Sequence, residues 1–282
     1  MGFGISEVDM ILITGATGFI GTHFVIALRK ESIMFRALIH KHKPEWLAHE
    51  ECIYGDLLEH IRLDDQGYKA VVHLAGGYSE ALNIRGTENL LVSCKEIGTR
   101  QIIFLSSADV FICPQTPYAI SKRQAEDKIR SSGIKYCIIR PSMVYGVGDH
   151  YIWPLFKMLK RYHVVLMPYR GLLRRPLYVD DLITRLIQLC REGDIPNYIN
   201  IVGGEVIDVG EIYNAIQEIV GVNRIGISIP HGLLKATATI IKRARYLQYG
   251  MVNKDLILTD EKVVFGKTTF RDGVRKMAVY CQ

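Results

Sequence analysis

Several patterns that mark other classes of protein are missing from this 282-residue chain. No apolar run approaches the roughly 20 residues that a membrane span needs. The first nine residues lack the basic start and apolar stretch of a secretory signal, so we expect an extension ahead of the first strand. The six cysteines form no C-x-x-C pair, and their spacing offers no metal site. Buried free thiols in a reducing, cytoplasmic compartment are therefore expected.

The positive charge is too evenly spread to indicate a nucleic-acid-binding protein. The formal net charge is +6, with small basic clusters at residues 41–43 and 242–245. An anionic small-molecule ligand accounts for this charge as well. The basic, apolar stretch 235–245 could touch a partner or a membrane surface, and a solvated amphipathic helix is the alternative.

Apolar runs alternate with segments of helical periodicity through the first half of the chain. This alternation predicts an α/β fold, a Rossmann-type doubly wound parallel sheet with helices on both faces. Residues 181–190 and 198–202 are interpreted as one more helix and strand of that sheet. The predicted strands are 10–13, 35–39, 51–54, 70–75, 101–105 and 136–139, and the predicted helices are 19–30, a segment around 82–94, and 118–131.

The regular alternation fails after about residue 145, which predicts a second part of the molecule. We expect residues 1–163 and 181–204 to form a dinucleotide-binding Rossmann domain. Residues 164–180 and 205–282 are expected to form a small, discontinuous C-terminal substrate lobe.

Three glycines recur at intervals of three residues directly after the first predicted strand. The segment Thr14-Gly15-Ala16-Thr17-Gly18-Phe19-Ile20-Gly21 leads into a predicted helix. In a dinucleotide-binding turn, one glycine permits the tight turn, a second lets the backbone approach the phosphates, and a third lets the helix pack against the strand. The helix N-terminus offers N–H groups to the anion. The context predicts an NAD(P) pyrophosphate site, with a glycine turn that binds no ligand as the alternative.

The end of the second predicted strand bears on the choice between NAD and NADP. The sequence there is Ile39-His40-Lys41-His42-Lys43, and no acid follows until Glu45. An acidic residue would bond the ribose hydroxyls of NAD, whereas a basic residue would accept the 2′-phosphate of NADP. His40 and Lys41 therefore favour NADP, with NAD possible, unless these bases only face solvent.

Tyr118 and Lys122 are four residues apart in a predicted helix, so they share a face. The pKa of tyrosine is about 10 in water, and an ammonium group together with an oxidised nicotinamide would lower it. Tyr118 is therefore a candidate general acid/base. Ser107 follows the fifth strand at the edge where ligands bind in such sheets, and its hydroxyl could hold a substrate carbonyl. The alternative is a solvated Tyr–Lys pair.

Further segments agree with these motifs in order and spacing. They are residues 55–57, 73–75, 83–89, 106–111, 118–122, 140–146, 178–182, 265–266 and 270–273. Together with the glycine loop, they resemble the extended short-chain dehydrogenase/reductase family, the group of NAD(P)-dependent nucleotide-sugar epimerases and dehydratases. The resemblance runs from Met10 to about Arg275.

The resemblance implies roles in cofactor binding. Asp56 and Leu57 would lie by the adenine, Ala75 and Gly76 near the ribose and pyrophosphate, and Pro141 by the nicotinamide. Lys122 would also bond the nicotinamide ribose. The complete predicted cofactor set is Gly15, Thr17, Gly18, Phe19, Ile20, Gly21, His40, Lys41, Asp56, Leu57, Ala75, Gly76, Tyr118, Lys122 and Pro141.

The resemblance also implies roles at the substrate. Tyr118 would transfer the proton, and Ser107 would polarise the substrate, so the predicted catalytic residues are Ser107, Tyr118 and Lys122. In the epimerases, an arginine shortly before the segment matching 178–182 binds the diphosphate of the sugar nucleotide. Arg174 falls there and suits bidentate phosphate contact, with a surface arginine as the alternative. Asp109 and Met143 complete the predicted substrate contacts.

Three departures from the family pattern narrow the range of reactions expected. The segment from Ser107 to Tyr118 is short, which predicts a trimmed substrate-covering loop. The dehydratases carry adjacent Asp and Glu after their Ser or Thr, whereas here Asp109 follows Ala108, which argues against sugar dehydration. Phe111 replaces a usual tyrosine, a packing change.

Three functions remain open from the sequence. The first is an epimerase or related oxidoreductase acting on a nucleotide sugar, with a tightly held cofactor and no net redox change. The second is an NADPH-dependent reductase of a keto-sugar or small ketone, favoured by His40, Lys41 and the short loop. The third is a cofactor-binding scaffold without turnover, disfavoured because Ser107, Tyr118 and Lys122 are all present. A homodimer paired through two helices is typical of the family.

Overall fold

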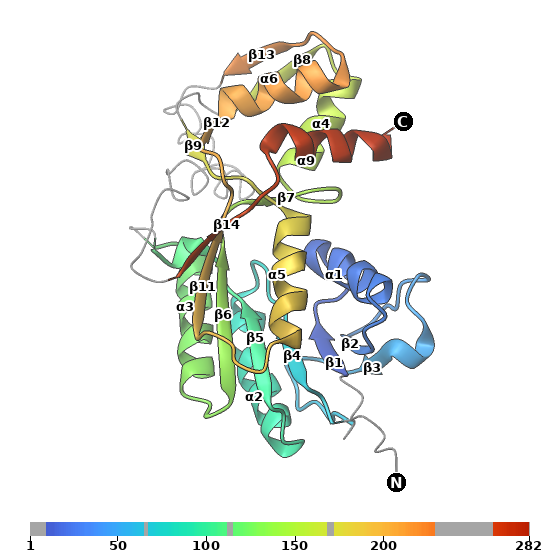
Figure 1. Cartoon of the computed structure of the whole chain (residues 1–282), viewed down its shortest axis with the longest axis vertical. Helices are drawn as coiled ribbons and strands as arrows, with labels where there is room; N and C mark the ends of the chain where they lie inside the picture. Colours follow the sequence, from blue (N-terminus) through green and yellow to red (C-terminus); the bar gives the residue numbers. More distant parts are fainter. Residues whose placement is uncertain (1–9, 65–66, 112–114, 168–171, 229–261, 282) are drawn as a thin grey trace. The chain divides into compact units, whose positions relative to one another are not determined.

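The computed structural model describes residues 10–64, 67–111, 115–167, 172–228 and 262–281 (Figure 1). The predictions for the extension 1–9, for Cys113 and for the stretch 235–245 lie outside the described residues. No helix within these ranges is long and apolar enough to cross a membrane.

An eight-stranded sheet forms the centre of the fold. Its strand order is β14-β11-β6-β5-β4-β1-β2-β3, and neighbouring strands from β3 to β6 are parallel. The strands are nearly continuous apolar runs, as expected where both faces of a parallel sheet are covered. Their bounds are β1 Ile11–Thr14, β2 Phe35–Ile39, β3 Cys52–Tyr54, β4 Ala70–His73, β5 Gln101–Leu105, β6 Lys135–Pro141, β11 Tyr198–Val202 and β14 Val263–Phe265.

Helices cover both faces of this sheet. Figure 1 draws α2 and α3 on one side and α1 and α5 on the other. On the first side, Leu12, Val71 and Ile102 of the strands share a buried cluster with Leu90 of α2 and Ile129 of α3. The elements are α1 Phe19–Lys30, α2 Thr87–Glu96, α3 Pro117–Arg130 and α5 Val179–Arg191, with short helical turns η1 His49–Glu51, η2 Leu82–Gly86 (a π-helix) and η3 Ala108–Phe111. The predicted Rossmann-type architecture is confirmed.

The chain divides into two compact units. The first comprises Met1–Arg140 and Leu182–Asn200, and the second comprises Pro141–Asp181 and Ile201–Gln282. The sequence pattern predicts this boundary later, near residue 163. The assignment of one part to the cofactor and the other to the substrate stays a prediction.

The second unit is built from short elements around an aromatic core. The ring of Tyr145 lies 5.4 Å from that of Tyr178 and 5.1 Å from that of Phe270 (centroid distances). Its strands pair as β7 Val144–Tyr145 with β10 Leu177–Tyr178, β9 Leu173–Arg174 with β12 Ile207–Asp208, and β8 Val164–Met167 with β13 Ile225–Ser228. The helices among its described residues are α4 Ile152–Arg161, α6 Val209–Val220 and α9 Phe270–Ala278, followed by η5 Val279–Cys281.

The prediction of buried free thiols is confirmed for the cysteines whose side chains are described. These four thiols are buried and free of disulfides, and they are Cys52, Cys94, Cys137 and Cys190.

Candidate active site

The start of helix α3 places the candidate acid/base. Thr116 caps the helix, since its Oγ1 accepts a hydrogen bond from the N–H of Ala119 at 3.0 Å, and Pro117 occupies the first helical turn. A Thr cap followed by proline is a strong local signal for a helix N-terminus. Tyr118 therefore lies in the first turn of α3, and Lys122 lies one turn further along the same face.

Ser107 and Tyr118 are brought together by hydrogen bonding in the first unit. Ser107 Oγ accepts a hydrogen bond from the N–H of Asp109 at 3.1 Å, so its own proton is available to another acceptor. Burial raises the pKa of the Tyr118 phenol, the Asp109 carboxylate raises it further, and the hydrogen bond with Ser107 lowers it. Tyr118 is therefore a neutral phenol, ready to donate a proton, at neutral pH.

Lys122 is a buried cation beneath this phenol. Its Nζ donates to the carbonyl oxygen of Leu105 at 2.9 Å and lies 4.7 Å from the centre of the Phe104 ring. Burial lowers the pKa of Lys122 to about 8, while the charge of Glu126 raises it. A solvated Tyr–Lys pair was the alternative expectation, and the 3% exposure of Lys122 contradicts it.

The turn after β4 lies beside this lysine. A Cβ added to Gly76 would lie 3.6 Å from Lys122 Nζ and 2.1 Å from Oδ1 of the buried Asn83. Asn83 holds the turn in place, because its Nδ2 donates to the carbonyl oxygen of Gly77 at 3.0 Å and to Ser121 Oγ at 2.9 Å. The predicted ribose-side residue Gly76 and the predicted catalytic Lys122 are therefore neighbours.

The glycine loop has the close packing that the sequence predicts. Gly15 has φ +77°, and an added Cβ would lie 2.6 Å from the backbone nitrogen of Ala75. A Cβ on Gly21 would lie 2.1 Å from the carbonyl oxygen of Gly15, so helix α1 approaches the turn too closely for any side chain. Gly18 caps α1 without a side-chain bond, and the first turn holds no acidic residue. Thr17 and Gly18 are exposed at the tip of the loop, whereas Phe19 and Ile20 are half-buried.

A buried histidine network behind the loop was not identified as functional from the sequence. Thr87 Oγ1 donates to the carbonyl oxygen of Asn83 at 2.6 Å, so it can only accept from His73 Nε2, 3.0 Å away. His73 Nδ1 must then accept from Thr14 Oγ1 at 2.6 Å. Burial, with the nearby Lys122 charge, lowers the pKa of His73 to about 3. The neutral ring thus ties β1, β4 and α2 together.

The carboxyl ends of β2 and β3 bring together two predicted adenosine-side residues. His40 is 51% exposed, and its Nε2 lies 3.1 Å from Asp56 Oδ2. Asp56 Oδ1 also accepts from the N–H of Leu58 at 2.9 Å, and Leu57 is buried. The sequence shows no acid directly after β2, but the fold supplies one from the neighbouring strand. Lys41 is exposed beside His40.

Three predicted site residues belong to the second unit. Pro141 ends β6 and is buried, and Met143 is half-buried before β7. Arg174 lies in β9 with 5% exposure, and its Nη1 donates to the carbonyl oxygen of Leu173 at 2.9 Å. The alternative of a surface arginine is therefore wrong, and the proposed phosphate role stays a prediction.

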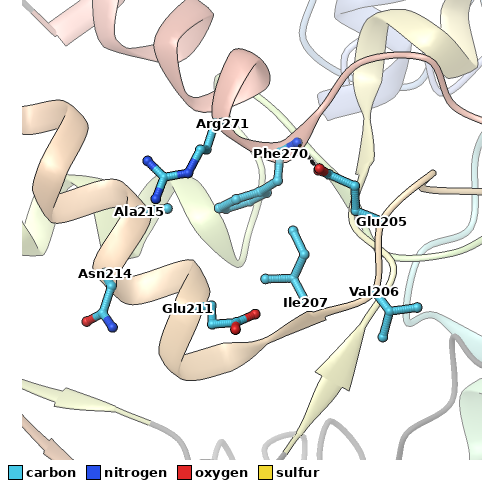
Figure 2. Close-up of a pocket in the computed structure, with 8 residues that line it drawn as sticks. All are labelled: Glu205, Val206, Ile207, Glu211, Asn214, Ala215, Phe270 and Arg271. Carbon is cyan, nitrogen blue, oxygen red and sulfur yellow. Dashed lines mark hydrogen bonds between the residues drawn. The ribbon is translucent and has the colours of Figure 1, made fainter.

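The second unit also holds an open pocket of about 570 Å³. It lies between β12, α6 and the start of α9, where Glu205 accepts a hydrogen bond from the N–H of Phe270 at 2.6 Å (Figure 2). None of the predicted site residues lines it. The lining is Glu205, Val206, Ile207, Glu211, Asn214, Ala215, Phe270 and Arg271.

Three buried residues that no sequence motif marked as functional adjoin the site. Ser106, Glu126 and Arg140 form a connected hydrogen-bonded set. The spacing gave a usable signal for Glu126, which follows Lys122 at the same interval of four as Lys122 follows Tyr118. Arg140 gave little signal, because an arginine at the end of an apolar strand is usually solvated.

The fold and the arrangement of these residues define a Rossmann-type dinucleotide-binding protein. The model of the NAD dependent epimerase/dehydratase family matches residues 11–202. The chain belongs to this family, and it is an enzyme of the NAD(P)-dependent epimerase, dehydratase and reductase group.

Curated relatives include both reductases and epimerases. A ceramide reductase of Caulobacter vibrioides is 30% identical over 195 residues, which are 64% of this chain and 61% of that protein. A putative UDP-glucose 4-epimerase of Methanocaldococcus jannaschii is 27% identical over 255 residues, 75% of this chain and 83% of its own length.

Solved structures share the fold over nearly the whole chain. MoeE5, in complex with UDP-glucose and NAD, has a TM-score of 0.72 at 20% identity, over 96% of this chain and 98% of its own. The UDP-glucose 4-epimerase of Thermotoga maritima, with UDP-glucose, has a TM-score of 0.70 at 20% identity, with the same coverage of both chains.

Proposed function

We propose that this protein is an NAD(P)-dependent oxidoreductase that acts on a carbinol or keto carbon of a nucleotide sugar, with Tyr118 as the acid/base. The observation that carries the proposal is the buried cation Lys122 one helical turn beneath Tyr118, whose phenol is hydrogen-bonded to Ser107. The nucleotide-sugar substrate is supported by the relatives named as epimerases and as sugar-nucleotide reductases.

The residues present fit a dinucleotide. The cradle at Gly15 and Gly21 excludes side chains, and the uncapped N-terminus of α1 offers N–H groups to a pyrophosphate. Asn83 Oδ1 is buried with no hydrogen-bond partner among the described residues, beside Gly76 and Lys122, where a ligand hydroxyl could donate to it. When bound, the nicotinamide supplies or accepts the hydride.

The chain's own groups then manage the proton. In reduction, the Tyr118 phenol donates its proton to the carbonyl oxygen as that oxygen gains negative charge, and Ser107 holds the same oxygen. In oxidation, Tyr118 must act as a phenolate, which the Lys122 ammonium stabilises. Because burial favours the protonated phenol, the resting state of the site suits the reduction step.

We further propose NADP(H) as the preferred cofactor. Lys41 is the cation offered to a 2′-phosphate, and Asp56 orients His40 beside it. The test is the ratio of the dissociation constants for NADPH and NADH in the parent, Lys41→Ser and the control Lys30→Gln, a lysine at the far end of α1. NADH binding more tightly than NADPH in the parent would contradict this preference.

A second candidate is an NADPH-dependent reductase of a non-nucleotide ketone. It is favoured by the ceramide reductase relative and by the short segment between Ser107 and Tyr118. The two candidates differ in substrate. Net redox change separates reactions within the first candidate, because an epimerase leaves NADPH absorbance constant whereas a reductase consumes one NADPH per product.

The decisive experiment identifies the cofactor that co-purifies and screens UDP-, GDP- and dTDP-sugars for binding and turnover. We expect Tyr118→Phe to lose about 100-fold or more in kcat, while Tyr280→Phe, a control at an exposed ring, keeps the parent kcat. Full activity of Tyr118→Phe would refute the mechanism. If the protein reduces a simple ketone and binds no nucleotide sugar, the first candidate is wrong and the second candidate, a ketone reductase, is supported.

A further inference from the structure

One face of α3 carries polar groups from the site into the interior. Tyr118, Lys122 and Glu126 follow at intervals of four residues, so they lie one above the other on that face. Lys122 is 3% exposed and Glu126 is 4% exposed. A buried carboxylate is costly unless it is paired and fully hydrogen-bonded, so Glu126 needs an explanation.

Arg140, near the end of β6, is the partner of Glu126. Its Nε donates to Glu126 Oε1 at 2.9 Å, and its Nη2 donates to Oε2 at 2.7 Å. The guanidinium carbon lies 4.8 Å from the centre of the Phe111 ring and 4.7 Å from that of Tyr198. The bidentate contact and the two rings fix the position of the arginine, which in turn fixes the position of the carboxylate.

Glu126 reaches the strand end that carries Ser107. Ser106 Oγ donates to Glu126 Oε1 at 2.5 Å. The N–H of Ser106 donates to the carbonyl oxygen of Ile139 at 2.7 Å, which ties the same residue to β6. Because Ser107 is the next residue, its position depends on both bonds.

Glu126 also supplies the negative charge that acts on Lys122. Burial lowers the pKa of Lys122, and Glu126 opposes this effect. The other groups around Lys122 include the Phe104 ring, the Leu105 carbonyl, Tyr118, the neutral ring of His73 on β4 and, near Gly76, the uncharged amide of Asn83. None of these groups is an anion while Tyr118 is protonated, so among them only Glu126 supplies a negative charge to Lys122.

We propose that Glu126 and Arg140 are positioning residues of the reaction, which hold the strand end bearing Ser107 and keep Lys122 a cation beneath Tyr118. This inference rests on the proposed function, which gives Tyr118 and Lys122 their roles. Without the carboxylate, Lys122 would lose its proton at lower pH, and the Tyr118 phenolate would lose its stabilising charge. Turnover would then be confined to a narrower pH range.

The test compares Glu126→Gln with a double variant, Glu126→Met and Arg140→Met, which replaces the buried pair by apolar side chains of similar length. Replacing both partners in this way often leaves the free energy of unfolding unchanged or higher. Removing only one partner leaves a buried charge without its partner, which is destabilising. The control is Lys128→Gln, which breaks an exposed pair between α3 and Glu88 at 3.1 Å. The readouts are kcat and KM across pH and the dissociation constant of the cofactor.

We expect kcat to fall about tenfold or more and its alkaline limb to move down by about one pH unit, with KM and cofactor binding within about threefold of the parent. The control should match the parent in each of these quantities. A folded variant with the parent kcat and pH profile would overturn the proposal. So would a lower stability with an unchanged pH profile, because that result shows a structural role alone.

If both carboxylate variants fail to fold, Ser106→Ala and Arg140→Lys decide the question. Ser106→Ala removes one hydroxyl and should lower kcat without changing KM. Arg140→Lys retains a positive charge but loses the bidentate contact with Glu126, so it should also lower kcat. Parent kcat in Ser106→Ala, or in folded Arg140→Lys, would overturn the proposal. Full activity of Tyr118→Phe would instead refute the proposed function, so the two failures are distinguishable.

Discussion

Replacing Gly21 by alanine should destabilise the protein, although alanine is normally the better helix residue. The new Cβ would lie 2.1 Å from the carbonyl oxygen of Gly15 and 2.7 Å from Cα of Ala16. Both atoms are backbone, so α1 or the loop must move by close to 1 Å before the contact reaches about 3 Å. Overpacking of this kind costs about 1–3 kcal/mol or more, and alanine returns only about 1 kcal/mol of helix propensity. We expect a net loss of about 1–2 kcal/mol in the free energy of unfolding.

Two other glycines serve as controls for this reasoning. A Cβ on Gly18 would lie 3.4 Å from the Gly15 carbonyl oxygen, an ordinary contact, so Gly18→Ala should cost at most about 1 kcal/mol. Its methyl group would occupy the face offered to the pyrophosphate, so the dissociation constant of NAD(P) should rise about tenfold or more. A Cβ on Gly193 meets nothing within 4 Å, so Gly193→Ala should change neither quantity appreciably.

The assay is urea unfolding followed by circular dichroism, combined with cofactor titration of each folded variant. Equal or greater unfolding free energy in Gly21→Ala would refute the packing argument. Parent affinity in Gly18→Ala would refute the placement of the pyrophosphate at this loop.

Three further predictions follow from the same unit. Thr116→Ala removes the cap of α3 and should lower the unfolding free energy by about 1 kcal/mol, measured by thermal unfolding, and an unchanged midpoint would contradict the cap. The pKa of His73 is about 3 in the folded protein and near 6.5 in the unfolded chain. Above pH 6.5 the free energy of unfolding is therefore unaffected by His73, and it falls as the pH drops toward 3. The loss at pH 5 should be about 2 kcal/mol, and urea unfolding of His73→Asn should show a flatter pH dependence than the parent. Tyr78 is 55% exposed, and its ring centre lies 5.1 Å from that of Tyr118, so Tyr78→Ala should raise the substrate KM about threefold or more, and an unchanged KM would exclude this ring from the substrate site.

The sequence alone determined the elements and the local part of the site. Strands such as β2 and helices such as α1 were predicted with the bounds that the structure has, because hydrophobic period and glycine punctuation are local signals. The glycine loop and the four-residue interval between Tyr118 and Lys122 are local signals of the same kind. The family followed from the order of these motifs, and the family comparison confirms it.

The second unit was less predictable. Its short strands β7, β9 and β12 have two residues each, too few to show a period, and each is defined by a partner distant in sequence. The pairing of β9 with β12, for example, joins residue 174 to residue 207. No local pattern encodes such a pairing.

Only the tertiary structure decided the electrostatics of the site. Asp56 meets His40, and Arg140 meets Glu126, because the carboxyl ends of parallel strands and the face of α3 converge in space. The burial of Lys122 and His73, which shifts their pKa values, depends on packing by every neighbouring element. The sequence thus specified which chemical groups are available, through local periodicity and turn chemistry. Their protonation and pairing were set by the fold, because charge interactions depend on distance and burial and not on separation along the chain.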